Sequence, residues 1–346
     1  MRVSDAKSMA RDWVMNEAGR LVGFHGAYFA GSANWLADDA QLPPTSDLDL
    51  NVVLSSGDPP PKRGKFVHGG VLLDVTFVSL AQLGSPEQVL GHYHLAGGFR
   101  RPGIILDPSG DLSALQAAVS RDFARREWIY RRCEHARRRI LEQLDTLDEA
   151  DPFHDQVLRW VFPTGVTTHV LLLAGLQNPT VRRRYVTTRA LLAQNGHPEF
   201  YETLLELLGC TRISRARVEH HFAALPDAFE AARVVLRTPF PFGSDISDAA
   251  RPIAIDGSRE LIECGLHREA VFWMVVSYSR CQKVLAADAP AGMHQQFDGG
   301  HRELLGDLGI ESFADLQRRS QLVRAHLPRL WKVAEGIIAS NPQVED

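Results

Sequence analysis

Cysteine is scarce in this chain of 346 residues, which contains only four, at positions 133, 210, 264 and 281. None belongs to a Cys-x-x-Cys pair, so neither a disulfide framework nor a thiolate zinc site is expected. Long hydrophobic runs are scarce too. The most apolar helical stretch, residues 271–278, is far shorter than the roughly 20 residues that span a bilayer. The N-terminus lacks the apolar core of a signal peptide. We therefore expect a cytoplasmic protein without membrane contact.

Neither sign of charge dominates, because 38 Lys and Arg residues face 42 Asp and Glu residues, for a net charge of −4. This balance excludes a chain built as a polycation for nucleic acid or membrane surfaces. Hydrophobic residues make up 45% and charged residues 23% of the chain, a globular composition that excludes disordered and collagen-like classes. We find no internal repeat and no low-complexity segment. The length is that of two ordinary domains.

Strand patterns are confined to the first third of the chain. We expect a helix over 4–20, capped by Ser4, and a hairpin at Gly69-Gly70, where both residues can take positive φ. The expected strands cover 21–30, 47–55, 65–68, 71–78 and 103–107, with helical segments at 33–38 and 80–96.

After about residue 112 the apolar period is helical. We expect helices over 119–145, 154–177, 179–196, 198–209, 213–235, 257–264, 271–285, 301–308 and 318–340. The sequence therefore predicts an α+β fold, with a small mixed-sheet catalytic domain over 1–117 and an all-helical domain over 118–346.

Two aspartates, Asp47 and Asp49, alternate along one of the expected strands. Alternate residues of a strand share a face, so both carboxylates point one way while Leu48 and Leu50 point into the core. Neighbouring carboxylates repel each other unless a cation or solvent screens them. Their oxygen atoms suit Mg²⁺, which keeps open positions for phosphate oxygens. The pair is therefore a candidate metal site.

A third acid and a Gly-Ser turn accompany this pair. Asp74 lies in an apolar strand, where an unpartnered carboxylate is costly, so it needs a partner or a metal. The register of the strand places Asp74 on the face of the Asp47 and Asp49 carboxylates, and we predict that the three cluster. Gly31 lets the backbone approach a phosphate closely, and Ser32 adds a hydroxyl at the N-terminus of a short helix.

This pattern of a strand ending in Gly31-Ser32, an Asp47-x-Asp49 strand and a third acid, Asp74, resembles the nucleotidyltransferases of the DNA polymerase β superfamily. The size and the helical C-terminal region are most similar to the antibiotic (aminoglycoside-type) members. The motif-level resemblance covers about residues 20–115. One departure is the connection of fourteen residues between Ser32 and Asp47, which is longer than the family's pattern.

The resemblance implies transfer of a nucleoside monophosphate from a nucleoside triphosphate, with ATP as the expected donor, to a hydroxyl of a small molecule, releasing pyrophosphate. An aminoglycoside-like antibiotic is a candidate acceptor, which implies a role in antibiotic resistance. The three aspartates would hold two Mg²⁺ ions and carry catalysis, with Asp74 the candidate general base. Gly31 and Ser32 would bind the nucleotide. Ser46 would join them, or else be a capping or turn residue or orient Asp47.

Two alternatives stay open at this stage. Residues 119–140 hold eight arginines and three acids, and Arg121, Arg125, Arg132 and Arg139 flank an apolar helical stripe. These arginines, like those at 182–184, are either a solvated, ion-paired flank or a positive wall for a triphosphate or RNA. The latter favours a nucleic acid or protein acceptor, as in toxin-type relatives. The other alternative is a non-catalytic nucleotide-binding module.

Two histidine patterns in the sequence are interpreted as ordinary structural residues. His92 and His94 form a His-x-His pair without a third ligand nearby in sequence, so zinc is not expected. Arg215 and His220 match the loose Arg-x₄-His pattern that resembles HEPN ribonuclease domains, but this spacing is common on helices. We assign neither pattern a role.

Overall fold

The computed structural model describes all 346 residues and shows a mixed α+β protein with one five-stranded mixed sheet and fourteen α-helices. The chain divides into two compact units. The first, here called the sheet unit, comprises Met1–His135, Leu176–Thr180 and Pro342–Asp346, and the second, the helical unit, comprises Ala136–Gly175 and Val181–Asn341.

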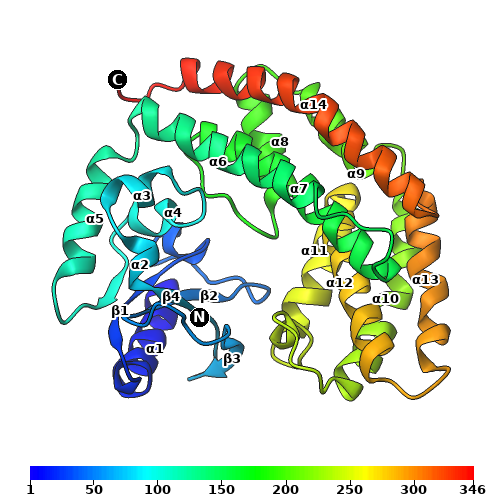
Figure 1. Cartoon of the computed structure of the whole chain (residues 1–346), viewed down its shortest axis with the longest axis horizontal. Coiled ribbons are helices and arrows are strands. Elements are labelled where there is room, and N and C mark those ends of the chain that lie inside the picture. The colour runs from blue at the N-terminus through cyan, green and yellow to red at the C-terminus, as the bar shows by residue number, and fades with distance from the viewer. The chain divides into compact units, whose positions relative to one another are not determined.

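All five strands belong to the sheet unit, in the order β3-β4-β2-β1-β5. Figure 1 labels β1 to β4 in the blue, N-terminal part of the chain. Their bounds are Phe24–Phe29 for β1, Leu48–Leu54 for β2, Gly64–His68 for β3, Val71–Ser79 for β4 and Ile104–Leu106 for β5. β2 and β4 are parallel and the other pairs are antiparallel. The predicted hairpin at Gly69-Gly70 is confirmed, with φ of +56° and +77° at the two glycines.

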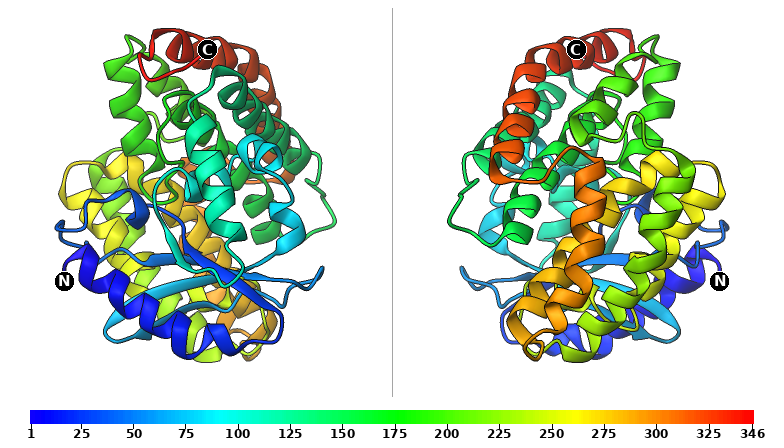
Figure 2. Two further views of the ribbon diagram at one scale, coloured as in Figure 1. Left: turned by 90° about the vertical axis from the view of Figure 1, so that its left-hand side faces the viewer. Right: turned by 90° about the vertical axis from the view of Figure 1, so that its right-hand side faces the viewer.

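Helix α1 (Val3–Asn16) lies across one face of this sheet (Figure 2). Its Trp13 and Val14 join a buried apolar cluster with residues of β2 and β4. The expected N-cap at Ser4 is wrong, because the helix begins one residue earlier, after Arg2. The backbone N–H groups of Val3 and Ser4 donate to the carbonyls of Ala40 and Asp38, and the N–H of Arg2 donates to the Asp5 carboxylate.

The remaining helices of the sheet unit are shorter than expected. The segment 80–96 forms two short helices rather than one, α2 (Leu80–Leu83) and α3 (Pro86–Gly91), and a third, α4 (Ala96–Phe99), begins at its last residue. The expected helix over 119–145 is two helices, α5 (Asp111–Asp122) and α6 (Arg126–Leu144). Because α5 contacts α3, α4 and β5, it belongs to the sheet unit, and the division falls between His135 and Ala136 rather than at residue 117.

The helical unit contains no strand. Its helices are α7 (Phe153–Ala174), α8 (Arg184–Gln194), α9 (Phe200–Leu208), α10 (Arg215–Val235), α11 (Gly257–Glu263), α12 (His267–Asp288), α13 (Met293–Asp307) and α14 (Phe313–Ser340). Helix α12 contacts α7, α10, α11 and α13, which explains why so much of its surface is buried.

Helix α7 is the most apolar long helix, not residues 271–278 as expected. By length and composition it is able to cross a membrane, but 83% of its most apolar 18-residue segment is buried inside the protein. It packs against α12 and α14 within the helical unit. The apolar surface of α7 is therefore used as core.

Candidate functional site: an acidic triad on the sheet

The three predicted aspartates meet on one face of the sheet. Asp49 in β2 pairs in register with Asp74 in the parallel neighbour β4, and Asp47 directly precedes β2. One carboxylate oxygen from each of the three lies within 4.8 Å of the others. Leu48 and Leu50 point the opposite way and are fully buried in the cluster under α1. The predicted convergence of the carboxylates is confirmed.

The register of β4 is strongly specified by its apolar side. Leu73 and Val75 are fully buried beneath α1, whereas Asp74, on the other face, is 5% exposed. A slip of one residue would place a carboxylate in the apolar cluster and move both apolar side chains out of it. The burial pattern therefore fixes the position of the third acid.

The Gly31-Ser32 turn lies directly against Asp49. Gly31 has a φ of +61°, and a Cβ atom there would stand 1.7 Å from Oδ2 of Asp49, so only glycine fits. The N–H of the preceding Ala30 donates to the carbonyl of Asp49 at 2.9 Å. Ser32 follows at the start of the 3₁₀ turn η2 (Ala33–Trp35), and its side chain makes no capping hydrogen bond.

Two lysines that the sequence analysis missed contact the triad. The Lys65 ammonium lies 3.2 Å from Asp47 and 2.5 Å from Asp74, and the Lys62 ammonium lies 2.7 Å from Oδ1 of Asp74. Lys65 pairs with Asp74 across the β3–β4 hairpin. Counting back from the Gly-Gly turn would have found Lys65, whereas Lys62 lies outside any strand and carried no signal.

The close approach of three acids shifts the titration of the central one. Burial, and then the neighbouring Asp47 and Asp74 carboxylates, raise the pKa of Asp49 well above its usual range, while Lys65 and Lys62 act in the opposite direction. Asp74 Oδ1 is buried and meets the Lys62 ammonium at 2.7 Å, without the orientation of a hydrogen bond. Three converging carboxylates form an all-oxygen donor set, which fits Mg²⁺.

The long connection before Asp47 is held by α1. Lys7 donates to Asp38 at 2.8 Å, and Leu42 donates its N–H to the carbonyl of Met1. The N–H of Ser46 donates to the carbonyl of Pro43 and closes a turn before the β2 strand. The turn role of Ser46 is confirmed, and its contact with a nucleotide stays a prediction.

The arginines of α5 and α6 do not form a free positive wall. Arg121 and Arg125 both pair with Asp122, and Arg139 pairs with Glu142. Arg132 is 1% exposed, and it donates to the carbonyls of Leu90 and Phe123. Burial lowers its pKa to about 10. The expectation of a flanking or ligand-facing Arg132 is therefore wrong.

The other residues that the sequence suggested as functional pack against neighbouring rings or form ion pairs. Arg184 is buried against the ring of Phe272, which corrects the surface expectation for that residue. His92 packs edge-on against His135, with ring centroids 4.3 Å apart. Arg215 pairs with Glu219 on its own helix.

No protein-family model matches the sequence, and no curated protein matches it. The assignment of function therefore depends on the geometry and chemistry of the triad.

Replacement of Lys65 with methionine tests whether the lysine substitutes for a metal. The metal-free variant should be about 3 kcal/mol less stable, because three carboxylates lose their nearest buried counter-charge. Mg²⁺ should then raise the Tm of the variant more than that of the wild type. Thermal unfolding with and without Mg²⁺ measures both effects.

Lys7→Met is the matched control, since Lys7 is equally buried but pairs with the exposed Asp38. It should leave the Mg²⁺-dependent shift in Tm unchanged. An unaltered metal-free Tm in Lys65→Met would contradict the proposed role of Lys65.

Proposed function

We propose that the protein is a Mg²⁺-dependent nucleotidyltransferase that moves a nucleoside monophosphate from a nucleoside triphosphate to the hydroxyl of a small molecule. The observation that carries this proposal is the convergence of Asp47, Asp49 and Asp74 beside a turn at Gly31, a position that only glycine fits. ATP is the proposed donor, and the helical unit is proposed to select the acceptor. The cytoplasm is the proposed location.

In the proposed reaction the acceptor hydroxyl loses its proton to solvent and its oxygen bonds to the α-phosphorus, while the bond from that phosphorus to the bridging oxygen breaks and pyrophosphate leaves. Bound Mg²⁺ would neutralise charge on the triphosphate and on the leaving group. The three aspartates would hold the metal, and the pairing of Asp49 with Asp74 on neighbouring strands, with Asp47 directly before β2, would keep their oxygen atoms preorganised. Gly31 and Ser32 would bind the terminal phosphates through backbone and hydroxyl groups.

Asp74 is better suited to holding metal than to accepting the hydroxyl proton. Its two carboxylate oxygens lie 2.7 Å from Lys62 and 2.5 Å from Lys65. A proton on Asp74 would compete with both contacts. We therefore propose Asp74 as a metal ligand and assign no general base.

The acceptor is proposed to be small. The arginines that favoured RNA or a protein are paired with acids or buried. An aminoglycoside-like antibiotic remains the first candidate to test, and with it a role in resistance.

The direct test incubates the protein with labelled ATP and Mg²⁺ and measures pyrophosphate release against a set of hydroxylated small molecules. We expect release that depends on one acceptor and labelling of that acceptor with the nucleoside monophosphate. A set including aminoglycosides and lincosamides covers the first candidates, and GTP, CTP and UTP test the choice of donor. Labelling of RNA or protein instead, with steep salt dependence, would favour a macromolecular acceptor.

One observation favours a second candidate, a nucleotide-binding module without turnover. Lys62 and Lys65 already compensate the acids, as would be needed in a site that never holds metal. Under this alternative, Mg²⁺ would not raise the Tm, and nucleotide would bind equally with and without it. The Mg²⁺-dependent Tm therefore separates the two candidates.

Ser32→Ala should weaken use of the triphosphate by about 1–3 kcal/mol, the scale of a hydrogen bond to a charged group. The hydroxyl is not engaged in capping, so the fold should be unaffected. Steady-state kinetics with several acceptors should show the same loss for each. A loss that varied with the acceptor would place Ser32 in another part of the site.

A further inference from the structure

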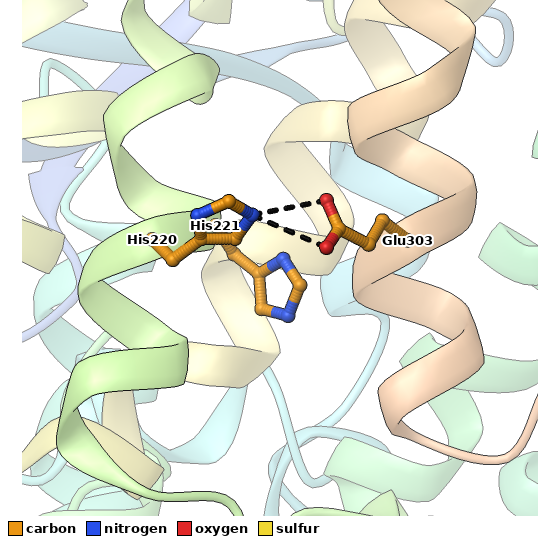
Figure 3. A group of neighbouring side chains, drawn as sticks. All are labelled: His220, His221 and Glu303. Carbon is orange, nitrogen blue, oxygen red and sulfur yellow. Dashed lines mark hydrogen bonds and ion pairs between the residues drawn. The ribbon is translucent and has the colours of Figure 1, made fainter.

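A second cluster of metal-ligating side chains lies in the helical unit, between α10 and α13 (Figure 3). His220 and His221 project from α10, and Glu303 projects from α13. One ligand atom from each lies within 4.8 Å of the other two. Nε2 of His220 is 3.0 Å and 3.2 Å from the two oxygens of Glu303. The cluster is built from residues unrelated to the acidic triad.

One of the three residues is anchored. The side chain of His221 is 1% exposed, and its Nε2 lies 2.7 Å from Oδ2 of Asp307. A carboxylate on one ring nitrogen fixes the orientation and tautomer of a histidine whose other nitrogen binds metal. Asp307 thus leaves Nδ1 of His221 as the nitrogen for a ligand.

The other two residues are half-exposed. The side chains of His220 and Glu303 are 55% and 47% exposed, so solvent reaches them. Metal–nitrogen and metal–oxygen bonds of zinc are about 2.0–2.2 Å, which sets ligand atoms of a tetrahedral site about 3.4 Å apart. The ligand atoms, now within 4.8 Å of one another, would therefore have to approach, and the two exposed side chains are the ones with solvent-side room to move.

Arg217 supplies a positive charge that compensates the Glu303 and Asp307 carboxylates. It lies 3.0 Å from Oε1 of Glu303 and 2.7 Å from Oδ2 of Asp307. A metal ion would compete with Arg217 for Glu303 but not for Asp307, which can keep its arginine contact and continue to orient His221.

We propose that His220, His221 and Glu303 bind a transition-metal ion of the zinc type, with Asp307 as the positioning residue for His221. Two imidazoles and one carboxylate favour zinc, nickel or cobalt over Mg²⁺. The ion joins α10 to α13 and keeps one coordination position for water or a further ligand. This site is independent of the proposed nucleotidyl transfer.

The test is calorimetric titration of the full-length, metal-stripped protein with Zn²⁺, and separately with Mg²⁺. We expect one Zn²⁺ per chain at this site, with binding at least about tenfold weaker in His220→Ala and in Glu303→Gln, the scale of losing support from a metal site. His221→Ala should lose binding too, but it removes a buried side chain, so the two exposed variants carry the test. Asp307→Asn should weaken binding about 10–100-fold.

Two further variants separate a metal site from an ion-pair network. Arg217→Gln should strengthen Zn²⁺ binding, because it removes the cation that competes for Glu303. Asp49→Asn, in the acidic triad, should leave Zn²⁺ binding at this site unchanged. Zn²⁺ affinity that is the same in the wild type, His220→Ala and Glu303→Gln would overturn the proposal, as would the absence of Zn²⁺ binding to the wild type.

Discussion

Replacing Asp49 with asparagine is expected to lower nucleotidyl transfer by at least about 100-fold, the scale of losing a preorganised electrostatic group, while raising the Tm of the metal-free protein. Asp49 is the central acid of the triad, since it pairs with Asp74 and lies against Gly31. The asparagine side chain keeps the shape but removes the charge that lies beside two like charges. Pyrophosphate release and thermal unfolding measure the two effects.

The pH dependence of the Tm shows how the charge of Asp49 affects the stability of the metal-free protein. The pKa of Asp49 is raised in the folded protein, so the folded state binds a proton more tightly than the unfolded state. Protonation of Asp49 therefore stabilises the folded state. This contribution is fully present below the pKa of Asp49 in the unfolded chain, about 3.9, and is lost as the pH rises through its pKa in the folded protein. Metal-free Asp49→Asn should lack this decline in stability.

Asp58→Asn is the matched control, because Asp58 is an exposed acid of the same unit outside the triad. It should change neither the activity nor the pH profile. Asp47→Asn should behave like Asp49→Asn in the activity assay. Retention of more than a few per cent of activity by both triad variants would eliminate the metal-dependent mechanism.

Gly31→Ala is expected to abolish measurable transfer and to destabilise the protein by about 3 kcal/mol or more, combining left-handed strain with a steric conflict. Its Cβ atom would stand 1.7 Å from Oδ2 and 2.5 Å from Cγ of Asp49. The carboxylate must therefore leave its place in the triad, or the turn must move. Chemical denaturation and the pyrophosphate assay report both consequences.

Gly70→Ala is the control that measures the cost of backbone strain alone, without a steric conflict. Gly70 has a φ of +77°, and a Cβ atom there would meet nothing within 4 Å, so it should cost only about 1–2 kcal/mol. Combining Gly31→Ala with Asp49→Ala should be less damaging to stability than the sum of the two, because the carboxylate in conflict is gone. Equal losses in Gly31→Ala and Gly70→Ala would show that Asp49 does not constrain the turn.

Strand alternation and turn chemistry carried most of the site prediction. The period of two along β2 and β4 placed the acids on one face, since the opposite residues are apolar and must be buried. The two-residue glycine turn set the hairpin register, from which Lys65 follows as the neighbour of Asp74. Local rules were sufficient here because they act within a few residues.

Helix boundaries and the fate of individual charged side chains depended on distant contacts. The burial of Arg132 depends on Leu90 and Phe123, whose carbonyls accept its hydrogen bonds. At the break between α5 and α6, the backbone of Ala124 and Arg126 bonds to the distant Glu345. A helical pattern locates an arginine at the edge of an apolar stripe, but it does not say which segment covers that edge. Spacing therefore could not distinguish the buried Arg132 from its ion-paired neighbours.

The sequence by itself determined the α+β organisation, the strand faces and the acids Asp47, Asp49 and Asp74, because backbone geometry and side-chain periodicity are local. Only the tertiary structure decided which groups those acids meet, and whether other polar residues converge. Lys62 reaches Asp74 from outside the strands. His220 meets Glu303, 83 residues away in sequence, only because α10 packs against α13. Such contacts arise from the packing of whole elements, which no short pattern encodes.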